Sequence, residues 1–185
     1  MSTRQSRFAK RLVMAGAVAL AVPAFLVGFQ FVQLVILDPF GGTPHPTDAA
    51  MLAQFADKRP ILEDLVVRIE QHPGLQRVGP DFTRPEDITS AAVSADEIAD
   101  FRRLCALAGV AHGFSHYGEA IKLIVHTSGL AISGSAKGFV YAEHADDDAT
   151  IIEGDLDAAA GASEHKDSLL MRRIEGDWWL ELDRR

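Results

Sequence analysis

The chain has 185 residues, a formal net charge of −8 and a single cysteine, which excludes an internal disulfide. All 26 acidic residues follow residue 37, whereas four of the 18 Lys and Arg residues precede it, so residues 38–185 carry a charge of −12. A partner such as nucleic acid needs a basic face, so no nucleic-acid binding is expected. The part after residue 37 is long enough for one domain with its own apolar core.

Residues 12–37 are an apolar run of 26 residues, LVMAGAVALAVPAFLVGFQFVQLVIL, without a charged side chain. About 20 apolar residues in a helix cross the hydrocarbon core of a bilayer. The eleven residues before the run contain four basic and no acidic side chains. Because positive charge stays on the cytoplasmic side, residues 1–11 are predicted to be a cytoplasmic tail and residues 12–37 a single transmembrane helix. The protein is expected in a bacterial inner membrane, with its C-terminal domain periplasmic or extracellular.

A cleavable signal peptide is the alternative interpretation of the same segment. The residues Val22-Pro23-Ala24 resemble a small-residue cleavage site behind a basic start. However, the apolar part of a signal peptide is about 7–15 residues long. Here apolar sequence continues well past Ala24, and a cleaved product would begin with the exposed apolar stretch Phe25-Leu26-Val27. The pattern therefore favours an anchor that is retained.

Residues 38–46, DPFGGTPHP, are rich in proline and glycine and are predicted to be a linker to a domain over residues 47–185. Apolar residues at helical spacing predict helices over 49–57 and 61–72, interrupted at Pro60. The clearest helix runs over Ser94–Ala108, because Ser94 and Glu97 form a capping box. Cys105 falls on its apolar face and is expected to be a core residue.

After residue 119 the apolar period changes to two, which is typical of strands. Strands are predicted over 120–126, 130–142, 149–153, 168–174 and 178–183, with a polar loop over 154–167. Helices followed by strands indicate an α+β fold, with two to three helices packed on an antiparallel sheet of four to five strands. The ending Ile174–Leu180 resembles the terminal hairpin of NTF2-like and cystatin-like domains, a likeness that transfers no site residue.

The segment Ser133–Gly138, SGSAKG, is the most unusual local sequence of the domain. Serine and lysine together can act as nucleophile and base, and a glycine-rich loop can hold phosphate. The complete signatures G-x-S-x-G, S-x-x-K and G-x-x-x-x-G-K-[ST] are absent from this segment, so a strand with a bulge is expected. The short polar side chains beside the lysine are the candidate binding residues, namely Ser133, Ser135 and Lys137.

Trp178 and Trp179 point to opposite faces of the last predicted strand. Trp178 is expected in the core with Leu180 and Leu182, and the turn at Gly176 is expected to have a positive φ. Trp179 is predicted to be the more exposed indole, either a binding side chain on the open face of the sheet or partly covered by the loop 154–167.

Two groups of residues resemble metal ligands. His112 and His116 are four residues apart and are followed by Glu119, but this stretch contains glycine and lacks the glutamate of zinc proteases. Residues 144–148, HADDD, offer oxygen ligands, but counting from Asp146 the calcium-loop spacing fails at positions 5 and 6. No metal site and no cofactor is therefore expected.

The sequence contains no complete catalytic constellation, so an enzyme is the least favoured function. A non-enzymatic, membrane-anchored domain that binds another envelope protein, or serves as an accessory subunit, is the first hypothesis. The alternative is a small-molecule-binding domain with an apolar pocket between its helices and a curved sheet.

Overall fold

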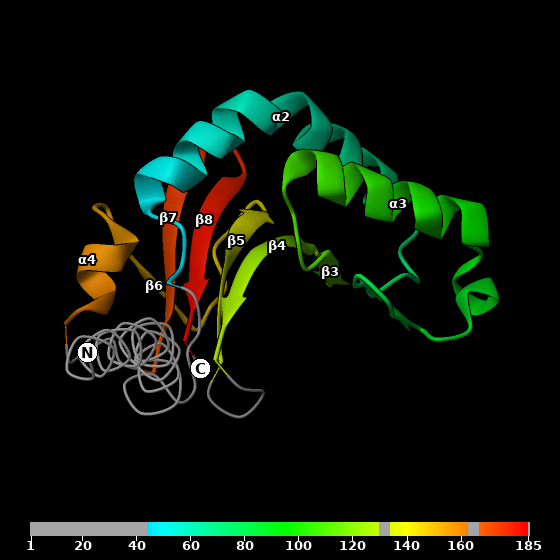
Figure 1. Cartoon of the computed structure of the whole chain (residues 1–185). Coiled ribbons are helices and arrows are strands. Elements are labelled where there is room, and N and C mark those ends of the chain that lie inside the picture. The colour runs from blue at the N-terminus through cyan, green and yellow to red at the C-terminus, as the bar shows by residue number, and fades with distance from the viewer. Residues whose placement is uncertain (1–43, 130–133, 163–166, 185) are drawn as a thin grey trace, which may run out of the picture. The chain divides into compact units, whose positions relative to one another are not determined.

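The computed structural model describes residues 44–129, 134–162 and 167–184 (Figure 1). The predicted tail and transmembrane segment, most of the linker and Ser133 lie outside these ranges, so the expectations for them stay predictions. Within the described ranges, no helix combines the length and the apolar character that crossing a bilayer requires.

The described part of the chain contains three α-helices, one 3-10 helix and a sheet of eight strands, so the predicted α+β class is confirmed. The helices are α2 (Asp48–Glu70), η2 (Ile88–Ala91), α3 (Ala95–Ala108) and α4 (Leu156–Ala160). The strands are β1 (Arg77–Val78), β2 (Thr83–Arg84), β3 (Phe114–Tyr117), β4 (Ala120–Ser128), β5 (Ser135–Tyr141), β6 (Ala149–Ile151), β7 (Leu169–Glu175) and β8 (Trp178–Asp183).

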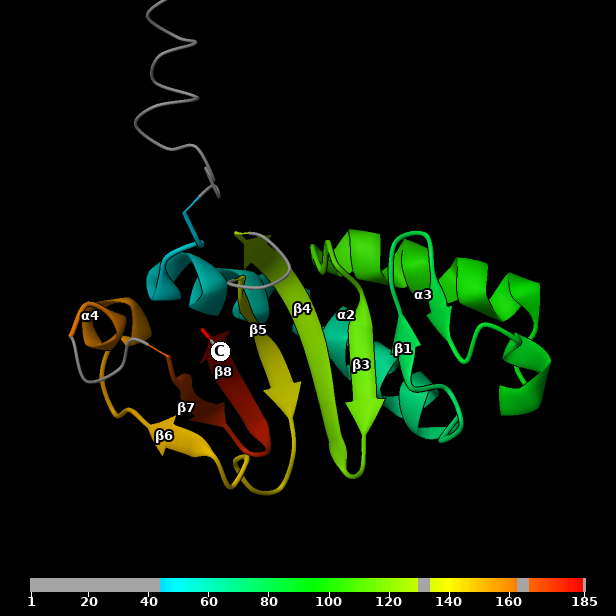
Figure 2. The ribbon, with the colours of Figure 1, turned by 90° about the horizontal axis from the view of Figure 1, so that it is seen from below.

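The sheet has the strand order β2-β1-β3-β4-β5-β8-β7-β6. Neighbouring strands are antiparallel except β6 and β7, which run parallel. The helices α2 and α3 lie on one face of the sheet, and Figure 2 shows the strands from the opposite side, in front of both helices. One face is therefore covered by helices, and the other carries none in the described part of the chain.

The expected number of four to five strands is wrong, because β1, β2 and β3 are additional. β1 and β2 have two residues each and lie between glycine and proline breakers, and so short a strand shows no readable alternation. The expectation of a wholly antiparallel sheet is also wrong at one edge. There α4 forms the crossover between β6 and β7, and a helix is the usual connection between parallel strands.

The helix α2 is one continuous helix of 23 residues, so the predicted interruption at Pro60 is wrong. Proline removes one backbone N–H donor inside a helix. Pro60 and Ala56 are both exposed, so the carbonyl that loses its donor can bind water. Buried residues on both sides, among them Phe55 and Leu62, hold the helix on the sheet, over which Figure 1 shows it arching.

The helix α3 confirms its prediction. The Ser94 hydroxyl accepts a hydrogen bond of 3.2 Å from the backbone N–H of Glu97, whose carboxylate accepts one of 2.8 Å from the backbone N–H of Ser94. Gly109 ends the helix with a left-handed φ of 73°. Cys105 is buried in the core, and burial raises the pKa of its thiol to about 12, so it is an inert core residue rather than a reactive thiol.

The helix α4 lies in the segment predicted to be a polar loop over 154–167, so that prediction is wrong where the segment is described. Asp155 caps the helix, since its carboxylate accepts a hydrogen bond of 2.9 Å from the backbone N–H of Ala158. Leu156 is fully buried. A helix of five residues is too short to show an apolar period, which is why the composition alone indicated a loop.

The main core fills the space between the helices and the covered face of the sheet. Phe55 of α2 contacts the rings of Phe139 and Trp178, at centroid distances of 5.7 and 5.3 Å. Leu180 and Leu182 belong to the same core, which confirms the predicted facing of β8. The turn before β8 also confirms its prediction, since Gly176 has a φ of 52°.

Candidate functional site

The open face of the sheet carries a groove of about 500 Å³ (Figure 2 shows this side of the sheet). Its floor comes from β4, β5, β7 and β8, and its rim from the β3–β4 turn and the loop between β5 and β6. The lining residues are Tyr117, Glu119, Ala120, Lys122, Val140, Ala142, Glu143, His144, Ala145, Asp146, Asp147, Asp148, Met171 and Glu181.

The rim of this groove is acidic. Five exposed carboxylates belong to it, namely Glu119, Glu143, Asp146, Asp147 and Asp148. The lining contains one lysine, Lys122, and one histidine, His144. Because a concave surface with charge of one sign concentrates the electrostatic field, the groove attracts cations.

Lys122 is already paired inside the groove. Its ammonium donates a hydrogen bond of 2.7 Å to Glu181 and lies 3.8 Å from a carboxylate oxygen of Asp146. Glu181 is nearly fully buried, and this burial raises the pKa of its carboxyl although the Lys122 charge acts in the opposite direction. The pair therefore neutralises the floor and leaves the rim with an excess of negative charge.

Trp179 is not exposed on this face, so the prediction of an open aromatic binding side chain is wrong. Its side chain is 7% exposed, against 4% for Trp178, and it packs with Val140, Ala142 and Met171 in a second small core. Its indole N–H donates a hydrogen bond of 3.0 Å to the carbonyl of Ala142. Trp179 thus supports the floor of the groove from the side and is absent from the lining.

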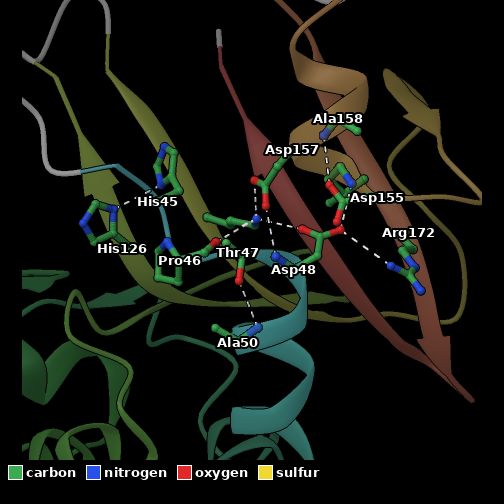
Figure 3. A network of polar contacts seen from close by, with 12 residues as sticks. His45, Pro46, Thr47, Asp48, Ala50, His126, Asp155, Asp157, Ala158 and Arg172 are labelled. Atoms are coloured by element: carbon green, nitrogen blue, oxygen red, sulfur yellow. Dashed lines mark hydrogen bonds and ion pairs between the residues drawn. The ribbon is translucent and has the colours of Figure 1, made fainter.

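Lys137 lies on the opposite, covered face of β5 and is fully buried. Its ammonium is 2.7 Å from a carboxylate oxygen of Asp48 and 2.6 Å from one of Asp157, and it donates a hydrogen bond of 2.9 Å to the carbonyl of Pro46. Figure 3 shows these partners converging from the starts of α2 and α4. We call Lys137, Asp48, Asp157 and Pro46 the Lys137 network.

Asp48 holds the network together. One of its carboxylate oxygens accepts a hydrogen bond of 2.7 Å from the backbone N–H of Leu156 and lies 3.6 Å from the Arg172 guanidinium of β7. Its own backbone N–H donates a hydrogen bond of 3.0 Å to Asp157. The network therefore ties two helix starts and two strands together, which is a structural role.

Three carboxylates in this region are close enough to share a cation. Oxygens of Asp48, Asp155 and Asp157 lie within 4.8 Å of one another. The Lys137 ammonium already supplies the positive charge to Asp48 and Asp157, and Asp155 caps α4. The arrangement is explained by the lysine, and we assign no metal to it.

Ser135 lies at the start of β5 and contacts residues that the sequence did not associate with it. Its hydroxyl is 2.6 Å from Nε2 of His45, whose Nδ1 is 3.1 Å from Nδ1 of His126 on β4. The two rings meet edge to face, with centroids 5.0 Å apart (Figure 3). Burial, reinforced by the nearby His126, lowers the pKa of His45 from 6.5 to about 4, so this imidazole is neutral at physiological pH.

The histidines singled out by spacing are not brought into a metal site. His112 lies beside Thr127, whose hydroxyl is 3.3 Å from Nε2, and His116 lies on β3. Burial lowers the pKa of both imidazoles. Within the described ranges, neither they nor residues 144–148 belong to a group of three metal-ligand side chains.

Of the four predicted site residues, the structure therefore places Ser135 and Lys137 against the segment that precedes α2, places Trp179 beside the groove floor, and leaves Ser133 outside the described ranges. The sequence missed His45, Asp48 and Asp157. None of the three stands in a recognisable motif. Comparison with family models, with curated proteins and with solved structures finds no match to this chain.

Proposed function

We propose that this protein is a membrane-anchored, non-enzymatic binding domain of the bacterial envelope, whose acidic groove takes a basic, extended segment of another envelope protein. The groove on the open face of the sheet is the observation that carries this proposal. It combines an acidic rim with a volume of about 500 Å³, and four neighbouring strands of the sheet form its floor.

The chemistry of the groove favours lysine and arginine side chains. Beside the Lys122–Glu181 pair, the floor is lined by the apolar residues Val140, Ala142 and Met171, which are themselves packed and leave little of their surface open. Lysine and arginine bury aliphatic stems against apolar surface while their charged ends stay near water. A stem lying along this floor would bring its charged end to the acidic rim. Tyr117, which is 52% exposed at the rim, adds an aromatic face for a cation.

The alternative, a small-molecule binder with an apolar pocket between helices and sheet, has less support. A more apolar hollow does lie between α3 and β1, lined by residues that include Val78, Cys105 and Val110, but its volume is about 240 Å³. Pockets for drug-sized ligands usually measure about 300–1,000 Å³. A hollow of about 640 Å³ between α2 and the β7–β8 turn is large enough, but its lining includes an arginine and four carboxylates, so it is not an apolar pocket. We therefore favour the acidic groove.

The membrane anchor in this proposal is supported by the sequence pattern alone. We propose that residues 12–37 hold the chain in the inner membrane, with residues 1–11 in the cytoplasm and the domain outside it. Alkaline phosphatase fused to the C-terminus should be active in cells, and a reporter that works only in the cytoplasm should be silent. An intact mass that corresponds to an exported chain beginning near Phe25 would contradict the retained anchor.

Binding of a model peptide tests the groove. The full-length protein in a non-ionic detergent is titrated into a fluorescent peptide that alternates Lys or Arg with small residues, and anisotropy is measured at low salt. Replacing the rim residues Glu143→Gln, Asp146→Asn and Asp147→Asn removes three charges. Each exposed pair is worth about 0.2–1 kcal/mol, so the dissociation constant should rise about tenfold.

The matched control removes three exposed carboxylates that do not line the groove, through Asp57→Asn, Asp81→Asn and Glu86→Gln. The net charge changes by the same amount, so a general attraction between an acidic protein and a basic peptide predicts equal weakening in both variants. The proposal requires the control to bind nearly as tightly as the unaltered protein. Equal loss in the two variants would refute the groove as the binding site.

A further inference from the structure

We propose that His45 and His126 form a binding site for a late first-row divalent transition metal ion, with the two Nδ1 atoms as its protein ligands. This inference is independent of the groove, since the two imidazoles lie on other residues and neither lines it. His45 comes from the segment that precedes α2, and His126 comes from β4. The fold therefore brings together two ligands that are far apart in the sequence.

The distance between the two nitrogens fits a shared ion. The Nδ1 atoms are 3.1 Å apart in a hydrogen bond to which one of the two rings supplies the proton, and a bound ion would take the place of that proton. Two imidazole nitrogens bound to one tetrahedral zinc ion at about 2.0–2.1 Å lie roughly 3.3 Å from each other. Only a few tenths of an ångström therefore separate the observed arrangement from a chelating one. Both side chains are partly exposed, so an ion can reach them from solution.

Ser135 can hold His45 in the tautomer that such a site needs. Its hydroxyl oxygen is 2.6 Å from Nε2 of His45. If Nε2 carries the proton and donates it to this oxygen, the lone pair of His45 stays on Nδ1, the atom that faces His126. Histidines that bind metals almost always donate their other ring N–H to a partner that orients them. Ser135 is therefore a positioning residue.

The positive charge of Lys137, which lies near His45, is already paired. Lys137 and Arg184 act on this imidazole as positive neighbours and Asp157 as a negative one. The Lys137 charge is paired with two carboxylates, so its field at the imidazole is reduced.

The contact between Ser135 and His45 also resembles that between a catalytic serine and its general base. That role needs the opposite tautomer, with Ser135 donating to His45, and a space for the substrate. Neither the groove nor the hollow between α3 and β1 includes Ser135, His45 or His126. The metal site needs no such space, because water completes the coordination of the ion.

Imidazole ligands suit zinc, nickel and copper, and Cu²⁺ binds most tightly in this series. The full-length protein, purified without a histidine tag, is titrated with Cu²⁺ at neutral pH and followed by calorimetry and electron paramagnetic resonance. We expect one ion per chain and a spectrum with two nitrogen ligands. His45→Ala and His126→Ala should each weaken binding at least about tenfold, and Ser135→Ala should weaken it less.

His144→Ala is the matched control, because it removes an exposed histidine from the acidic groove. It should leave Cu²⁺ affinity unchanged. If either His45→Ala or His126→Ala binds Cu²⁺ as tightly as the unaltered protein, or if His144→Ala weakens binding as much as they do, the proposal is overturned. If circular dichroism shows that a variant does not fold, the site is tested on the unaltered protein by NMR. Addition of Zn²⁺ should shift the imidazole resonances of both His45 and His126, and resonances that do not move would refute the site.

Discussion

Removing the positive charge of the Lys137 network should strongly destabilise the domain. In Lys137→Met, the carboxylate of Asp48 loses the ammonium at 2.7 Å while its side chain stays 1% exposed. Breaking a buried ion pair by removing one partner costs about 3–5 kcal/mol when the remaining charge is uncompensated. The Arg172 guanidinium, 3.6 Å from Asp48, still offsets part of this charge, so the loss should lie near the lower end of that range. Many domains have a total stability of only about 5–15 kcal/mol, so this loss is a large fraction.

The double variant Lys137→Met/Asp48→Asn separates the cost of an orphaned charge from the loss of packing. With both charges removed, the asparagine can still accept the hydrogen bond from the backbone N–H of Leu156. Asp157 keeps its charge, but its side chain is 36% exposed and can bind water. The double variant should therefore be more stable than the sum of the two single losses predicts, with a coupling of about 1–3 kcal/mol.

Urea unfolding of the full-length protein in a non-ionic detergent, followed by circular dichroism and tryptophan fluorescence, measures these free energies. Lys58→Met is the matched control, because Lys58 pairs with Asp57 at 2.8 Å with its side chain 37% exposed. That exposed pair should be worth less than about 1 kcal/mol. If Lys137→Met costs no more than Lys58→Met, or if the double variant shows no coupling, the reasoning about the buried network is wrong.

Three further predictions follow from the core, the last turn and the groove floor. Phe101→Ala should cost about 3–5 kcal/mol in urea unfolding, because the ring is 3% exposed, whereas Phe82→Ala, with a ring 41% exposed, should cost clearly less; similar losses would place Phe101 outside the core. Gly176→Ala should lower stability by about 1–2 kcal/mol from its φ of 52° alone, since no atom other than those of its chain neighbours lies within 4 Å of the added carbon. An unchanged stability would contradict this. Burial raises the pKa of Glu181 in the folded protein above 4.5, so the folded state holds this proton more tightly and loses stability as pH rises from 4.5 through the raised pKa. The stability of Glu181→Gln relative to the unaltered protein should therefore increase over that pH range, and a decrease would show the opposite shift.

The local signals in the sequence predicted the elements that depend on local interactions. The capping box at Ser94, the apolar face of α3 and the positive φ at Gly176 are all confirmed. Each of these features involves residues within a few positions of one another. The alternation in β8 also predicted that Trp178 is buried with Leu180 and Leu182, because facing follows from a period of two.

Features that depend on distant contacts could not be predicted in the same way. The continuity of α2 through Pro60 results from packing of both halves on the sheet, which outweighs one missing hydrogen bond. The burial of Trp179 results from a second small core on the open face, whereas the pattern of β8 indicates only that Trp179 points away from Trp178.

The candidate sites depend on such contacts even more. The sequence singled out Ser135 and Lys137, but their partners His45 and Asp48 come from the opposite end of the domain. Residues 143–148 are recognisable from the sequence alone as a charged segment. Its position over β4 and β5, beside the Lys122–Glu181 pair, follows only from the strand order.

Hydrogen–deuterium exchange of the full-length protein, with and without the basic peptide, tests the central claim most directly. If the acidic groove is the binding surface, the peptide should slow exchange in residues 117–122 and 140–148, which form its floor and rim. Exchange in α3, on the covered face of the sheet, should stay unchanged. Protection of α3 with none in those two segments would contradict the proposed binding site.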